Sequence, residues 1–161
     1  ATAELRRATT RGCELTALFA DVVEADESEA GGDEDPVTHT ILSAVAVLVF
    51  MHHSEVEGLQ KYTPGFVRLG LRRDHDGRPL AAPRELTMAG GTSIEVVELI
   101  SSTAAPAAES LKVTYYKPLG DGEWLGILTF QTPNAEMEPE WTEVFRAVAD
   151  TLSVEIPAMS S

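Results

Sequence analysis

Residues 111–152 read LKVTYYKPLGDGEWLGILTFQTPNAEMEPEWTEVFRAVADTL and contain the clearest structural pattern in the chain. At the start of this stretch, apolar residues alternate with other residues, which is the period of a half-buried strand (Leu111, Val113 and Tyr115). A turn-forming PLGDG segment then precedes a second apolar run at 124–131. The pattern therefore predicts a hairpin of two antiparallel strands.

A helix is predicted directly after this hairpin. Thr132-Pro133-Asn134 interrupts the second strand. Beyond it, apolar residues recur at offsets of three and four, which is the spacing of one face of an amphipathic helix (Trp141, Val144, Phe145, Val148 and Leu152). We expect this helix to pack on the last two strands, with Phe145 in the core.

The first part of the chain predicts another pair of strands. Residues 12–23 alternate between apolar and other side chains and predict a strand with Cys13 on its inner face. Residues 24–36 (EADESEAGGDEDP) predict a mobile loop, because so acidic a segment buries too little apolar surface to offset its ordering entropy. The Val-, Ile- and Leu-rich residues 37–50 predict a second strand, antiparallel to the first.

A helical region and a second hairpin are predicted between these two parts. Residues 54–73 have mostly helical spacing, with Ser54 as the candidate N-cap and a split into two pieces at Pro64-Gly65. Segments 84–89 and 92–101 are strand-like, and the Gly90-Gly91 dipeptide between them is suited to a tight turn.

The predicted fold is therefore α+β, with an antiparallel sheet of about six strands flanked by helices. The expected order is β-β-α-β-β-β-β-α. With 161 residues, of which 43% are hydrophobic, the chain is expected to form one domain, residues 1–161, with the mobile acidic loop at 24–36.

Net charge narrows the range of partners. Asp and Glu outnumber Lys and Arg by 26 to 12, and the resulting charge of −14 opposes binding to nucleic acid or to an anionic membrane. The most apolar run, 41–50, is about half the ~20 residues of a membrane-spanning helix, so no membrane insertion is expected. We expect a cytoplasmic protein, with export as the alternative if a segment upstream of Ala1 was removed.

The last third of the chain resembles actinobacterial proteins of the broad Mog1/PsbP-like group, which includes LpqN-type lipoproteins and DcrB-like proteins. Residues 84–154 carry the resemblance through a strand ending in LTF, the TPN breaker and a helix built on Phe145 and Ala149. The resemblance implies a binding, chaperone or accessory domain, and no functional residue carries over from the group. Cys13 departs from the lipoprotein pattern, because it follows Thr-Thr-Arg-Gly and no hydrophobic region.

Residue types that could carry chemistry do not form a recognisable motif. His52-His53 lacks metal-ligand spacing, and neighbouring histidines at a strand end are expected to point to opposite faces. Cys13 is better explained as a small buried apolar residue than as a nucleophile, and Trp124 and Trp141 as core residues. Asp26, Asp33 and Asp35 of the acidic loop lack the EF-hand order of ligands and glycine, so a solvated charge run explains them better than a calcium site. We therefore predict no metal, no cofactor and no catalytic residues.

The sequence favours a non-catalytic binding or accessory domain that engages a protein partner. Its acidic cluster is the candidate contact, through steering of a basic partner (Asp33, Glu34 and Asp35). The alternative function is a GAF-like small-molecule sensor, because such domains also end in a strand similar to LGILTF, a short loop and a helix. The identity of the partner and the oligomeric state are open.

Overall fold

A computed structural model of the chain describes the backbone at residues 4–6, 13–24, 39–71, 77–101 and 108–151, with side chains from residue 42 onward in these ranges. The described elements comprise eight strands, two α-helices and three 3-10 turns. The strands are β1 (Glu4–Arg6), β2 (Cys13–Glu24), β3 (His39–His52), β4 (Arg78–Pro79), β5 (Arg84–Met88), β6 (Gly91–Ser101), β7 (Glu109–Leu119) and β8 (Trp124–Thr132). The helices are α1 (Pro64–Leu71) and α2 (Glu138–Thr151), and the 3-10 turns are η1 (His53–Glu55), η2 (Gly120–Gly122) and η3 (Ala135–Met137).

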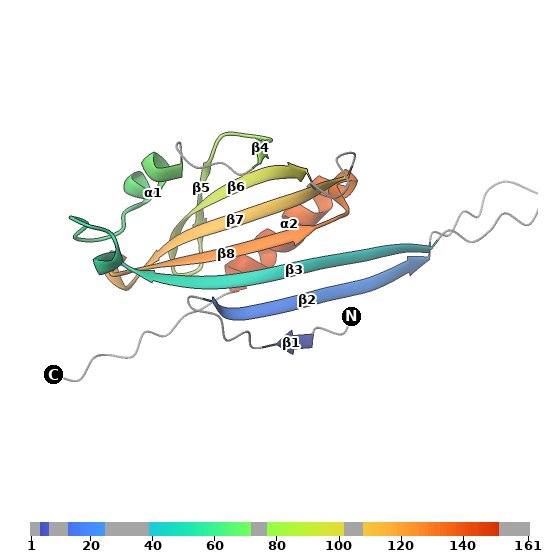
Figure 1. Ribbon diagram of the computed structural model, residues 1–161, viewed down its shortest axis with the longest axis horizontal. Coiled ribbons are helices and arrows are strands. Elements are labelled where there is room, and N and C mark those ends of the chain that lie inside the picture. Colours follow the sequence, from blue (N-terminus) through green and yellow to red (C-terminus); the bar gives the residue numbers. More distant parts are fainter. Residues whose placement is uncertain (1–3, 7–12, 25–38, 72–76, 102–107, 152–161) are drawn as a thin grey trace, which may run out of the picture.

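All described strands form one antiparallel sheet in the order β1-β2-β3-β8-β7-β6-β4, and β5 pairs with β6 beside β4 (Figure 1). Six of these strands have five residues or more, while β1 and β4 are short. The predicted α+β class and antiparallel sheet are confirmed, and the longer strands and the two α-helices follow the predicted order.

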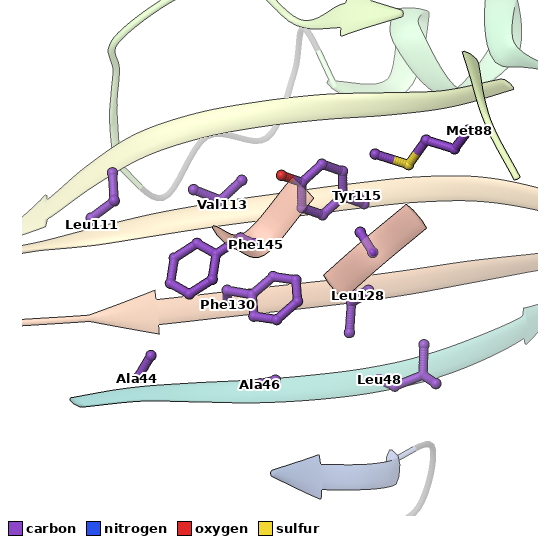
Figure 2. Packing of buried hydrophobic residues seen from close by; sticks show 11 residues of the cluster. Ala44, Ala46, Leu48, Met88, Leu111, Val113, Tyr115, Leu128, Phe130 and Phe145 are labelled. Atoms are coloured by element: carbon purple, nitrogen blue, oxygen red, sulfur yellow. The ribbon is translucent and has the colours of Figure 1, made fainter. Parts of the chain in front are cut away.

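One face of the sheet forms the main core with α2, which lies behind β6, β7 and β8 in Figure 1. Because strand side chains alternate between faces, every second residue of β3, β7 and β8 points to this helix. Figure 2 shows the resulting cluster, in which the Phe145 ring of α2 stacks on Phe130 of β8 with centroids 4.5 Å apart. Phe145 is almost fully buried, as predicted.

The opposite face carries a second, smaller core beneath α1. Val67 and Leu71 of this helix, with Tyr62 just before it, pack on buried residues of β6 and β8 (Ile94, Val96 and Leu125). The two helices therefore cover different faces of the sheet.

Both predicted glycine-containing hairpins are present. The β7–β8 hairpin pairs Val113 with Phe130 and closes at Leu119 and Trp124. In the β5–β6 hairpin, the two connecting residues are Ala89 and Gly90, because Gly91 already pairs with Met88, so the turn lies one residue earlier than predicted. The hairpin of β2 and β3 is also confirmed, whereas residues 25–38 between them lie outside the described part.

The predicted apolar face of the last helix is partly wrong. Val144 and Val148 are 50% and 37% exposed, and Thr142 and Ala149 are buried with Phe145 instead. The reason is a pair of polar contacts on one side of α2, described below, that turns the helix toward β6. Leu152 lies outside the described residues.

The predicted helix at 54–73 is also corrected. Helix α1 begins only at Pro64, whose fixed φ and missing N–H suit the first helical position, so this proline starts the helix and does not split it. Ser54 is not an N-cap: it lies inside η1, which is capped by the His52 side chain. Residues 72–73 lie outside the described part.

None of the helices in the described ranges is both long enough and apolar enough to cross a membrane.

Candidate functional site

A groove of about 680 Å³ runs along one side of α2. One wall is the first half of this helix, the other is the connection from β4 to β5, and the floor is β6. We call it the α2 groove, and its lining residues are Leu80, Ala81, Ala82, Arg84, Glu95, Val97, Glu138, Pro139, Thr142, Glu143 and Arg146. The groove therefore combines an apolar wall with a strongly charged floor and helix side.

Glu95 is the central charged group of the α2 groove, and only 4% of it is exposed. Its Oε2 accepts a hydrogen bond from Arg146 Nε at 3.0 Å, and its Oε1 accepts one from Arg146 Nη2 at 2.9 Å. Oε1 also accepts from Arg84 Nη2 at 3.1 Å. A buried carboxylate is tolerated only when it is paired and hydrogen-bonded, and these three bonds meet that requirement.

Strand register and helix position bring the three charged groups together. Arg84 of β5 lies directly opposite Glu95 of β6, so both side chains lie on the same face. Arg146 follows Phe145, whose ring is fixed in the core, and this anchors the guanidinium group above β6. The arrangement is therefore held by the sheet and by the core together.

Two arginines share one carboxylate, so this end of the α2 groove has a surplus positive charge. The side chains of Arg84 and Arg146 remain 56% and 39% exposed. The hydrogen bond to Glu95 raises the pKa of Arg146, against an opposing effect of burial. Both guanidinium groups are thus accessible to an anionic group from outside.

The Tyr115 hydroxyl lies beneath this cluster. Tyr115 of β7 pairs with Glu95 in the register, and its buried Oη interacts with the Glu95 carboxylate and with Arg146. Burial, and then the negative charge of Glu95, raise the pKa of Tyr115 above its usual 10.0. A neutral phenol is therefore the form that the folded state requires.

This pKa shift predicts a loss of stability at alkaline pH. The folded protein keeps the Tyr115 proton at pH values where the unfolded chain has released it, so stability is intact below about pH 10 and falls as the pH rises further. The slope attributable to one such proton is about 1.4 kcal/mol per pH unit. Urea melts between pH 9 and 11.5 should show a shallower decline for Tyr115→Phe than for the wild type. Equal slopes would contradict the prediction, since the raised pKa of Tyr62 affects both proteins alike.

A second cavity, of about 580 Å³, lies at the end of the sheet where the β5–β6 and β7–β8 turns meet the end of α2. Two of its four ionic lining residues, Lys117 and Asp150, make structural contacts, whereas Lys61 and Asp121 make none within the described residues. Lys117 Nζ donates to the Ala89 carbonyl oxygen, and Asp150 Oδ1 accepts from the Ala89 N–H at 2.8 Å. This clamp on Ala89 and the Arg146–Glu95 pair are the polar contacts that turn α2 toward β6.

The paired histidines are arranged differently from the prediction. The rings of His52 and His53 are 4.4 Å apart, because β3 ends at His52 and η1 begins at His53. The expectation that they point to opposite faces is therefore wrong. His52 Nδ1 lies 2.7 Å from Ser54 Oγ and also accepts from the Ser54 N–H at 3.3 Å, while Nε2 is 3.7 Å from Glu123 Oε1. Capping of η1 explains the contacts between His52 and Ser54. The 3.7 Å between His52 Nε2 and Glu123 Oε1 is too long for a hydrogen bond, so these two residues do not form a catalytic pair.

The other residues considered from the sequence are less informative. Asp33, Glu34 and Asp35 lie outside the described residues, and the side chain of Cys13 is not described. Across the described ranges, no three His, Cys, Asp or Glu side chains gather into a group that could hold a metal ion. Trp124 and Trp141 are half-buried, and Trp141 stacks on Phe145.

Sequence reasoning missed the cluster around Glu95. One signal was available: along β6, Glu95 has the same phase as Ser93, Val97 and Leu99, so a charged residue occupies the inward-facing side of the strand. A carboxylate in that position needs cationic partners, but the sequence does not say which arginines supply them.

No protein-family model matches the sequence, and no curated protein or solved structure shows a significant match to it. Its function is therefore argued from the chemistry of the α2 groove.

Proposed function

We propose that this chain is a non-catalytic binding domain that engages a protein partner through the α2 groove. The observation that carries the proposal is the surplus of guanidinium groups over carboxylate at Glu95, next to an apolar wall. Arginine beside accessible apolar surface is typical of the contacts that dominate protein interfaces. We also propose that the fold is that of the Mog1/PsbP-like group, which residues 84–154 resemble in sequence and whose members are mainly binding or accessory domains.

Two cavities could hold a ligand: the α2 groove and the second cavity, of about 580 Å³, at the end of the sheet. The α2 groove is the better candidate, and it is suited to a partner protein. In the cavity, Lys117 and Asp150 are held by Ala89, and a ligand would have to compete for both groups. In the groove, the arginines keep exposed donors after binding Glu95, and Leu80 on the opposite wall is 40% exposed. The alternative function, small-molecule sensing, would use the cavity.

Arg84→Gln is predicted to weaken capture of the partner. This change leaves both oxygens of Glu95 bonded to Arg146, so the fold should be retained while one accessible guanidinium group is removed. Wild-type and variant proteins would be immobilised, exposed to native lysate and compared by quantitative mass spectrometry. The amount of a groove-binding partner captured by Arg84→Gln should be about fivefold or more below the amount captured by the wild type, which is the effect of a centrally placed arginine.

Arg68→Gln is the matched control for this experiment. Arg68 is 46% exposed and pairs with Glu85 at 3.3 Å, but it belongs to α1 on the other face of the sheet. Its loss changes the net charge by the same amount and leaves the groove intact. If the two variants capture every protein equally well, or if Arg68→Gln alone depletes the partner, the groove is not the binding surface.

A further inference from the structure

We infer, on the basis of this proposed function, that the α2 groove recognises an extended segment with a carboxylate at one residue, an apolar side chain two residues away and a basic side chain four residues away. The segment could run in either direction along the groove. Three features of the groove lead to this pattern, one at each end and one between them.

The basic end of the groove is formed by Arg84 and Arg146. Glu95 accepts three of the N–H groups that these two side chains carry, which leaves further N–H donors on both arginines. Because the pair is held by a carboxylate that is almost fully buried, it is fixed in position before a partner arrives. A carboxylate of the partner matches this end by charge and by geometry.

The opposite end of the groove is acidic. Glu138 opens α2 and accepts a hydrogen bond from Thr142 Oγ1 at 3.0 Å, while Glu143 lies closer along the helix to Arg146 than to Glu138. Glu138 and Arg146 are eight residues apart, which corresponds to about 12 Å along a helix axis. A second carboxylate of the partner would be repelled here, whereas a lysine or arginine would be attracted.

Apolar groups line the middle of the groove. Leu80 and Val97 lie side by side, because the Leu80 N–H donates to the Val97 carbonyl oxygen at 2.9 Å. This bond also occupies the edge of β6, so the segment would be read through its side chains and not by addition of a strand. In an extended chain, residues i, i+2 and i+4 point to the same side and span about 13 Å, which matches the length of the groove.

The test uses blocked pentapeptides and ¹⁵N-labelled protein. Acetyl-Glu-Thr-Val-Thr-Lys-amide and the reverse order would be titrated while the amide signals of residues 80–84 and 138–146 are followed. One of the two orders should shift these signals, and replacing its Glu by Gln should raise Kd about two- to fivefold, as for an exposed ion pair. Arg84→Gln should raise Kd of the charged peptide by a similar factor but leave that of the Gln peptide unchanged, which is the signature of a direct contact.

Several results would overturn the inference. The first is a Gln peptide that binds with the same Kd as the Glu peptide. The second is that the effects on Kd of Arg84→Gln and of the peptide's Glu-to-Gln change are independent. The third is a control peptide with adjacent Glu and Lys that binds as tightly as the spaced peptide. If the peptides leave the groove signals unchanged while partner capture depends on Arg84, the segment pattern is wrong and the proposed function stands. If capture is indifferent to Arg84→Gln, the proposed function itself fails.

Discussion

Phe145→Ala is expected to lower the free energy of unfolding by ~3–5 kcal/mol, the range for removal of a buried aromatic side chain. The Phe145 ring is almost fully buried and stacks on Phe130 and on Trp141, with centroid distances of 4.5 and 5.1 Å. Its removal takes away the contact that fixes α2 on the sheet and leaves a cavity between them. Urea denaturation monitored by tryptophan fluorescence would measure the loss.

Val148→Ala provides the control on the same helix. Val148 is one turn further along α2 and is exposed, so its truncation should change stability by no more than about 0.5 kcal/mol. A large loss from Val148→Ala combined with a small loss from Phe145→Ala would show that Val148, and not Phe145, faces the sheet.

Gly122→Ala is expected to cost more than about 2 kcal/mol, because it combines two unfavourable effects. Gly122 has φ +90°, a conformation that residues with a side chain rarely adopt. A Cβ atom at this position would also overlap the carbonyl oxygen of Tyr62. The Tyr62 N–H donates to the Gly122 carbonyl oxygen at 2.7 Å, so the overlap would disturb the contact that ties the β7–β8 connection to the segment before α1.

Gly58→Ala separates these two effects. Gly58 also has a positive φ, +77°, but a Cβ there would meet no atom within 4 Å. Only the backbone term remains, so the expected loss is about 1–2 kcal/mol. Thermal melts of both variants would measure the difference, and equal losses would mean that the Gly122 contact adds nothing to the backbone strain.

The strands and the last helix were predictable because their patterns are local. Alternation in 111–116 and the PLGDG segment define the β7–β8 hairpin without reference to the rest of the chain. The rotation of α2 was not predictable in this way, since it depends on Arg146 and Asp150 meeting groups more than 50 residues away in the sequence. A hydrophobic pattern gives the general direction of a helix face, and distant polar contacts then adjust it.

The candidate site shows the same limit more strongly. Glu95 could have been noticed as a charged residue in an inward phase of its strand. Its partners come from β5 and α2, and the opposite wall of the α2 groove comes from the β4–β5 connection. A site assembled from three separate segments, 80–84, 95–97 and 138–146, leaves no spacing motif in the sequence.

The two walls of the α2 groove differ in how freely they can change. The α2 wall is tied to the core through Phe145 and to β6 through Arg146, so substitutions there would disturb folding as well as binding. The facing residues, Leu80, Ala81 and Ala82, are exposed, and only the backbone of Leu80 is bonded to β6. Under the proposed function, protein engineering that aims at a new target would therefore vary these three side chains and keep the helix side constant.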